Sequence, residues 1–148
     1  MGGFSRDGLA WRLLLPPDLV GKFSINVLEF LVAYITLYLV LRENGQNRRV
    51  LAFSDSSSAL GWLYRASFAQ GQDCHDSVAR AFAKLMIKAD SALYSQHIQG
   101  RHNVLADMLS RDHHISNAIL TLTFHTLFPI QTPTNFKIRA VPPEIISW

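Results

Sequence analysis

Three carboxylates stand where the sequence predicts that regular elements begin or end. Glu29 falls in the first turn of a predicted apolar helix, Asp55 follows a short apolar run, and Asp107 falls in or just after the first turn of a later predicted helix. Acids at the ends of different elements can converge in space although they are far apart in the sequence. We therefore treat these three residues as candidates for one shared site.

A cluster of three carboxylates has a definite chemistry. Two ionised carboxylates about 4 Å apart repel each other by roughly 4 kcal/mol at an effective dielectric of about 20, so the cluster stays ionised only with cations. Carboxylate oxygens are hard ligands that favour Mg²⁺ or Mn²⁺. Two such ions about 4 Å apart can activate a water molecule and stabilise the leaving oxygen of a phosphodiester. The three acids thus predict two-metal phosphodiester hydrolysis.

Each acid also has an ordinary structural explanation. Glu29 completes a capping box with Asn26, and Asp55 is placed to cap the helix that follows it. Asp107 interacts favourably with the dipole of its own helix. Taken singly, each acid is explained as well by helix structure as by catalysis, so the hypothesis depends on the three meeting in space.

The first half of the chain predicts a hairpin followed by a central helix. An Asp-Gly pair in the segment 5–8 separates two apolar runs, Gly2–Phe4 and Leu9–Leu15, which is a strong signal for two antiparallel strands. A pair of prolines then ends the second strand. The helix expected over Val27–Leu41 is apolar almost all round, which is typical of a helix enclosed by other layers.

The remaining elements follow from turn clusters and periodicity. Val50–Phe53 is expected to be a buried strand, and the later elements are a short helix over Ala59–Leu63, a loop containing Gly71, a helix from Asp76 or Ser77 to near Asp90, a strand over Ala92–Ile98, a turn over Gln99–His102, a helix capped by Asn103 and a helix over Asn117–Phe128. Prolines predict extended or irregular chain beyond that. This order predicts an α/β domain with a mixed sheet flanked by helices.

Basic residues suggest a second kind of contact. Arg80, Lys84 and Lys88 recur every four residues, opposite the predicted apolar face of their helix. Such a stripe is either a solvated outer face or a surface for a nucleic-acid backbone. The net charge of +3 is compatible with a polyanionic partner but does not require one. Cys74 is the single cysteine, which excludes an intramolecular disulfide and any zinc site with two or more thiolates.

The sequence predicts neither secretion nor a membrane span. Met1–Trp11 lacks the basic and then apolar layout of a signal peptide. The uncharged stretch Phe30–Leu41 would span only about 18 Å of a hydrocarbon core of roughly 30 Å, and Glu29 lies at its start. We expect a buried helix, no membrane contact and an intracellular location in the cytoplasm or nucleus.

Three segments resemble a known family. Ser24–Glu29, Phe53–Ala59 and, most specifically, His97–Arg111 with the sequence HIQGRHNVLADMLSR resemble the ribonuclease H-like region of retroelement reverse transcriptases, especially the DIRS-type group. The resemblance covers roughly residues 2–114. It implies a ribonuclease H-like domain over 1–114, and a C-terminal tail or linker over 115–148 that leads toward a downstream polyprotein domain.

The resemblance implies an activity and site residues. The enzyme would cut the RNA strand of an RNA–DNA hybrid, with Glu29, Asp55 and Asp107 as the second, third and fourth acids that bind two Mg²⁺ or Mn²⁺ ions. His102 would stand in for the histidine that assists product release in cellular ribonucleases H. Nucleic-acid contacts are expected from five residues, Arg80, Lys84, Lys88, Arg101 and Asn103. The expected partner besides the hybrid is the reverse transcriptase domain of the same polyprotein.

One part of the family pattern is missing. The first acid of the family lies on a central strand just before the hairpin, whereas this chain starts at Met1-Gly2-Gly3, and Asp7 in the hairpin turn is a poor substitute. We therefore expect an incomplete N-terminus, a missing central strand and impaired activity. The alternative is a non-catalytic, connection-type or nucleic-acid-binding module that packs against a polymerase.

Overall fold

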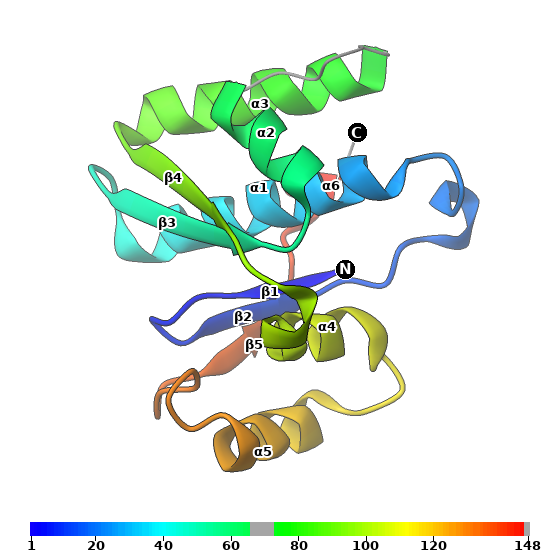
Figure 1. Cartoon of the computed structure of the whole chain (residues 1–148), viewed down its shortest axis with the longest axis vertical. Coiled ribbons are helices and arrows are strands. Elements are labelled where there is room, and N and C mark those ends of the chain that lie inside the picture. Colours follow the sequence, from blue (N-terminus) through cyan, green and yellow to red (C-terminus); the bar gives the residue numbers. More distant parts are fainter. Residues whose placement is uncertain (66–72, 147–148) are drawn as a thin grey trace.

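The computed structural model describes residues 1–65 and 73–146, which form an α/β structure with six α-helices and two small sheets in that part of the chain (Figure 1). The sequence predicted the α/β class and the flanking helices. It predicted one mixed sheet, and this is wrong for the described residues because two strands that would have to pair do not. The expected loop around Gly71 lies outside the described residues.

The first sheet is built on the predicted hairpin. Strand β1 (Gly2–Phe4) pairs antiparallel with β2 (Leu9–Arg12), with Gly3 opposite Trp11. The turn is closed by Gly8, whose φ of 97° suits glycine. Strand β5 (Lys137–Arg139) adds to the other side of β2 in parallel, so this sheet is mixed, with the order β1-β2-β5.

The second sheet has two parallel strands. Strand β3 (Arg49–Ser54) pairs with β4 (Ala92–His97) over its whole length. The expectation of a buried strand at Val50–Phe53 is wrong, because alternate residues of β3 are exposed: Leu51 is 51% exposed and Phe53 46%. Burial of an apolar run needs cover on both faces, and only one face of β3 has it.

Helix α1 (Ile25–Asn44) lies against both sheets. Its N-cap is Ser24, whose hydroxyl accepts from the Val27 amide at 3.4 Å, so the expected cap at Asn26 is wrong. At 20 residues the helix is longer than predicted, and by length and composition it is apolar enough to cross a membrane. Half of its most apolar window is nevertheless buried inside the fold, as in the central helix of a globular domain.

The middle helices follow the predicted order. Helix α2 (Ser57–Arg65) comes directly after β3, and α3 (Asp73–Ala89) precedes β4. A short 3-10 turn, η2 (Gly100–His102), leads into α4 (Val104–Arg111). A second 3-10 turn, η1 (Pro17–Leu19), lies between β2 and α1. The predicted apolar face of α3 is confirmed, since Val78, Phe82 and Ala89 are buried and Leu85 packs against the same cluster.

The segment after residue 114 folds onto the rest of the chain. Helix α5 (Asn117–Leu127) was predicted, whereas β5 and the short α6 (Pro143–Ile146) were not. Strand β5 pairs with β2, and the Arg12 guanidinium donates to the carbonyls of Asp112 at 3.0 Å and Ile115 at 2.7 Å. The predicted tail therefore supplies structure to the same unit. Its connection to a downstream domain stays a prediction.

Two apolar clusters hold the layers together. The larger one surrounds α1 and joins residues of both sheets, with Phe30, Ile35 and Trp11 fully buried. The smaller one lies on the other face of the first sheet and consists of Ala10, Leu105, Leu109, Leu120, Phe124 and Phe136. Strand β1 is thus enclosed between α1 and α4, and this contact is close enough to require glycine.

Replacing Gly2 by alanine is expected to lower the free energy of unfolding by about 1–3 kcal/mol. A Cβ atom at Gly2 would lie 2.6 Å from the Cβ of Leu109 and 2.8 Å from its carbonyl carbon, and a helix backbone cannot turn aside. Gly61→Ala in α2 is the matched control, because its nearest neighbour is the Arg65 guanidinium at 3.7 Å. That change should stabilise by about 0.5–1 kcal/mol. Equal urea midpoints for the two variants would contradict this packing.

Candidate functional site

Glu29 lies on the second turn of α1, not in its first turn, since the helix begins at Ile25. Its side chain is half-buried. Burial raises the pKa of Glu29 above its ordinary value, and the negative charge of Asp55 raises it further. The Met1 ammonium lowers this pKa, and Asp107 adds a smaller upward contribution. The carboxyl group therefore lies within electrostatic reach of both other predicted acids and of the N-terminus.

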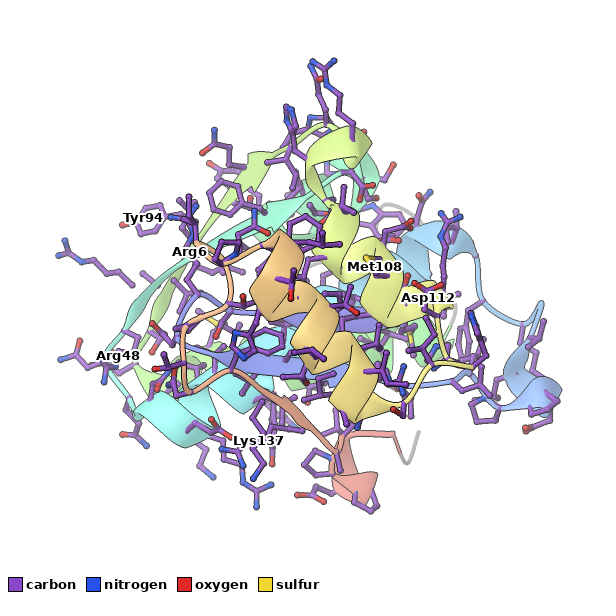
Figure 2. All side chains as sticks on the ribbon, turned by 90° about the horizontal axis from the view of Figure 1, so that it is seen from below. Arg6, Arg48, Tyr94, Met108, Asp112 and Lys137 are labelled. Atoms are coloured by element: carbon purple, nitrogen blue, oxygen red, sulfur yellow. The ribbon has the colours of Figure 1, made fainter. Side chains whose placement is uncertain are left out.

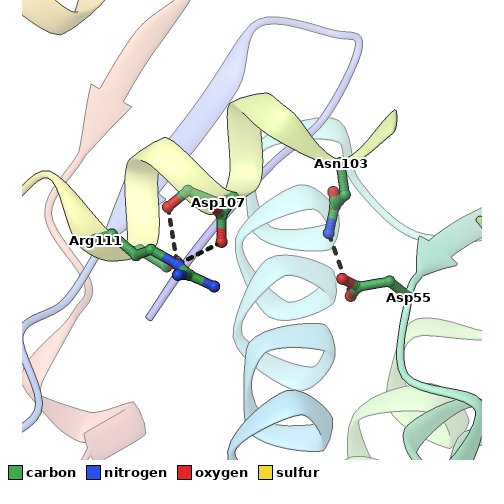
Figure 3. Close-up of polar contacts among 5 residues, drawn as sticks. Asp55, Asn103, Asp107 and Arg111 are labelled. Atoms are coloured by element: carbon green, nitrogen blue, oxygen red, sulfur yellow. Dashed lines mark hydrogen bonds and ion pairs between the residues drawn. The ribbon is translucent and has the colours of Figure 1, made fainter. Parts of the chain in front are cut away.

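Asp55 is the first residue after β3, as predicted, and it is exposed. Its Oδ1 accepts from the Nδ2 of Asn103 at 3.4 Å, and its main-chain carbonyl lies 3.2 Å from Nε2 of His97 at the end of β4. A Cβ atom at Gly100 would lie 3.3 Å from Oδ2 of Asp55. The end of β3 and the turn before α4 are thus in direct contact (Figure 3).

Asp107 lies in the first turn of α4 and is half-exposed. Its Oδ1 forms an ion pair at 2.6 Å with Nε of Arg111 one turn later, and Figure 3 shows this pair on the same helix whose start carries Asn103 toward Asp55. The pair neutralises part of the negative charge that Asp107 presents. Asp107 keeps its structural explanation as a residue that favours the helix dipole.

The structural explanations of the other two acids fail. The cap of α1 is Ser24, so Glu29 belongs to no capping box. The Ser56 hydroxyl accepts from the Ala59 amide at 3.2 Å, so the cap of α2 is formed by Ser56 and not by Asp55. A half-buried glutamate on an apolar helix without a capping role is costly for the fold, and this makes a functional explanation stronger.

The three acids approach each other without forming a ready metal site. Among the residues that the structure describes, no group of three or more His, Cys, Asp or Glu side chains is arranged to hold a metal ion. Asp55 and Asp107 are turned toward Asn103 and Arg111 respectively. Their charges still act on Glu29, so the arrangement is a loose acidic cluster at the end of β3.

The positive group in this cluster is the N-terminus. The Met1 ammonium donates to the Leu13 carbonyl at 2.8 Å, and burial lowers its pKa while Glu29 raises it. Asp7, the poor substitute for a first acid, lies at the other end of β1 and accepts from Asn44 Nδ2 at 3.2 Å. Asp7 therefore stands away from the other acids.

The remaining predicted residues fall into two groups. Arg101 and His102 lie exposed in η2, next to Asn103 and close in sequence to the acidic cluster. The exposed residues Arg80, Lys84 and Lys88 lie on α3, which Figure 1 places beyond α2 and far along the molecule from α4. The structure therefore does not bring the basic stripe to the acids, and its role in binding stays a prediction.

Two contacts at Asp55 were missed in the sequence. His97 was assigned only to a strand, although it is the last residue of β4 and is paired with Ser54 beside Asp55. Asn103 was expected as a helix cap, but its side chain makes no capping bond and donates to Asp55 instead. The parallel register of two strands would have been needed to place His97, and no local pattern reveals it.

Comparisons with known proteins identify no relative: no family model matches the chain, and no match was found among curated proteins or solved structures.

Replacing Glu29 by glutamine is expected to stabilise the metal-free protein at pH 7. The pKa of Glu29 is higher in the folded than in the unfolded chain, so stability falls as pH rises from about 4.5 through the raised value. Glutamine removes this loss, and the gain should shrink toward pH 4, where the carboxyl is protonated. Urea unfolding at both pH values measures it, with the exposed Asp18→Asn as the control for one lost charge. A less stable Glu29→Gln at pH 7 would mean that a partner stabilises the Glu29 anion.

Proposed function

We propose that this chain is a ribonuclease H-like domain of a retroelement reverse transcriptase polyprotein, which hydrolyses the RNA strand of RNA–DNA hybrids with two Mg²⁺ or Mn²⁺ ions. In the chain as given this activity is impaired, because one of four acids is missing. The observation that carries the proposal is the electrostatic contact of Glu29 with both Asp55 and Asp107. These acids come from three different elements, 26 and 52 residues apart by numbering.

The donor set suits hard divalent cations. Three carboxylates whose charges act on one another are relieved by a divalent ion, and all of them offer oxygen ligands. Glu29, Asp55 and Asp107 would hold the metal, which supplies an activated water and neutralises charge on the phosphate when bound. Asp107 would first have to leave the guanidinium of Arg111, which is exposed and free to move.

Neighbouring residues have positioning and binding roles. The Asn103 amide holds one oxygen of Asp55 and leaves the other near the backbone of Gly100. Arg101 and His102 lie on the adjoining turn and are exposed, so they can contact the phosphate backbone of a hybrid. Backbone contacts follow the shape of a hybrid and not its sequence, which fits an enzyme without base specificity.

A second candidate is a non-catalytic, connection-type or nucleic-acid-binding module that packs against a polymerase. It is favoured by the ion pair of Asp107 with Arg111 and by the lack of a fourth acid near Glu29 in the described residues. Under this candidate the acidic cluster is a remnant, and binding would survive the loss of any one acid.

The test uses four labelled substrates of one sequence with Mg²⁺: an RNA–DNA hybrid, duplex DNA, duplex RNA and single-stranded RNA. The protein is this chain carrying an aspartate-bearing strand ahead of Met1. We expect cleavage of the RNA strand of the hybrid alone. Hybrid binding without cleavage would favour the non-catalytic module, and equal cleavage of duplex DNA would exclude a ribonuclease H-like activity.

A further inference from the structure

The edge of β1 that faces away from β2 has no strand partner among the described residues. Met1 and Leu13 exchange both main-chain hydrogen bonds, and the Ser5 amide donates to Leu9. Because main-chain groups alternate along a strand, those of Gly2 and Phe4 point to the opposite edge. No bond from them to another described residue occurs, although Gly2 is buried. Buried main-chain groups are rarely left unpaired.

Strand β3 has a free edge of the same kind. The carbonyls of Arg48 and Ser54 accept from Ala92 and Ile98, so the even-numbered residues of this strand face β4. The amides and carbonyls of Leu51 and Phe53 therefore point away from β4. Within the part of the chain that the structure describes, they make no main-chain bond to another strand.

The two free edges face each other. At one end, Asp7 in the hairpin turn accepts from Asn44, whose carbonyl accepts from Arg48 just before β3. At the other end, Glu29 interacts electrostatically with both Met1 and Asp55. Figure 1 shows β1 and β3 running in opposite directions with no strand between them. A chain lying between them would be antiparallel to β1 and parallel to β3.

The surroundings of these edges are apolar. Trp11 and Leu9 of the first sheet and Val50 and Leu93 of the second pack into the same cluster around α1, which therefore lies beneath both sheets. On the other face of the second sheet, Leu51 and Phe53 are about half-exposed and Tyr94 is 57% exposed. An exposed edge with apolar side chains and little charge is a template for strand addition.

We propose that the space between β1 and β3 binds one extended segment of a partner polypeptide, which joins the two sheets into one with the order β4-β3-segment-β1-β2-β5. Only an extended chain offers hydrogen bonds to both edges, since a helix satisfies its own main-chain groups. The inference depends on strand topology and stands or falls independently of the nuclease proposal.

The charges define the chemistry of this segment. Arg6, Arg48 and Arg49 are exposed at the end where the segment would begin, against Asp7 alone, and Figure 2 shows Arg6 and Arg48 along one side of the molecule with Tyr94. We expect acidic residues at the N-terminal end of the segment and apolar residues at alternate positions after them. The apolar side chains would cover α1 on one face and extend the Leu51 and Phe53 surface on the other.

The test uses a synthetic, end-blocked peptide of about eight residues with two glutamates followed by alternating valine and threonine. Hydrogen exchange followed by NMR is the measurement. The amides of Gly2, Phe4, Leu51 and Phe53 should become at least about 10-fold more protected on saturation, whereas the Val50 and Ala52 amides, already bonded to β4, should change little. Apolar adsorption without strand pairing would not produce this alternation.

Two matched changes sharpen the result. N-methylation of alternate peptide amides removes donors from one edge and should abolish the protection without altering the protein. Leu51→Pro removes only a donor at the free edge of β3 and should prevent binding, while Leu51→Thr keeps the donor and should bind. If the free peptide binds too weakly to detect, the same strand joined to Met1 through an Asn-Gly turn should give the same pattern.

Protection of neither edge by the free or the tethered strand would overturn the proposal. Uniform protection without alternation would also overturn it, because it would indicate general stabilisation. Alternating protection without hybrid cleavage would leave strand binding in place and count against the nuclease. Hybrid cleavage by the tethered protein without alternating protection would do the reverse.

Discussion

Joining a strand that carries one aspartate ahead of Met1 is expected to raise Mg²⁺-dependent cleavage of the RNA strand of a hybrid by at least about 100-fold over the chain as given. The chain as given presents three acids, and one of these is held by Arg111. A fourth carboxylate at the end of such a strand would lie near Met1, on the same side as Glu29. The extra negative charge would then compete with Arg111 for a divalent cation.

Within that extended protein, Asp55→Asn is expected to lower cleavage by at least about 100-fold, because the amide keeps the shape but loses the charge that binds the cation. Asp55 caps no helix, so the substitution should leave the melting temperature nearly unchanged. Activity is followed by release of labelled RNA, and folding by thermal melting of the same samples. Asp18→Asn is the control, since Asp18 is exposed in η1.

Two results would contradict this assignment. Undiminished cleavage by Asp55→Asn would remove Asp55 from the mechanism. Equal activity of extended proteins with aspartate or asparagine at the added position would mean that the strand acts by completing the sheet and not by binding metal.

Phe124→Ala is expected to cost about 3–5 kcal/mol of the free energy of unfolding. Phe124 is fully buried between α4 and the C-terminal segment, and its ring packs edge-on against Phe136 with centroids 6.0 Å apart. Truncation removes the contacts of this ring with residues far apart in the sequence. An effect of this size would show that residues 117–139 are part of one cooperative unit with the hairpin and α4.

Leu122→Ala on the same helix is the matched control. Leu122 is 69% exposed, so the change should stay within about 0.5 kcal/mol. Both variants are compared by urea unfolding, and the slope of the transition reports how much surface unfolds together. A Phe124→Ala protein that melts in two steps, with the first step confined to α5 and β5, would mean that the C-terminal segment is a separate unit.

The sequence alone determined the elements whose signals are local. The Asp-Gly turn predicted the hairpin of β1 and β2, and apolar periodicity predicted the long central helix and the buried face of α3. Helix α5 and the position of Asp55 at the end of a strand were also correct. These features depend on neighbours within a few residues, and so the sequence carries them directly.

The tertiary structure alone decided what depends on distant partners. It paired β5 with β2, turned Asn103 toward Asp55 and Asp107 toward Arg111, and left two sheet edges without a connecting strand in the described chain. It also brought the charges of Glu29, Asp55 and Asp107 within reach of each other. Pairing and electrostatic contact between residues dozens of positions apart depend on which surfaces are buried together, and no local pattern encodes that choice.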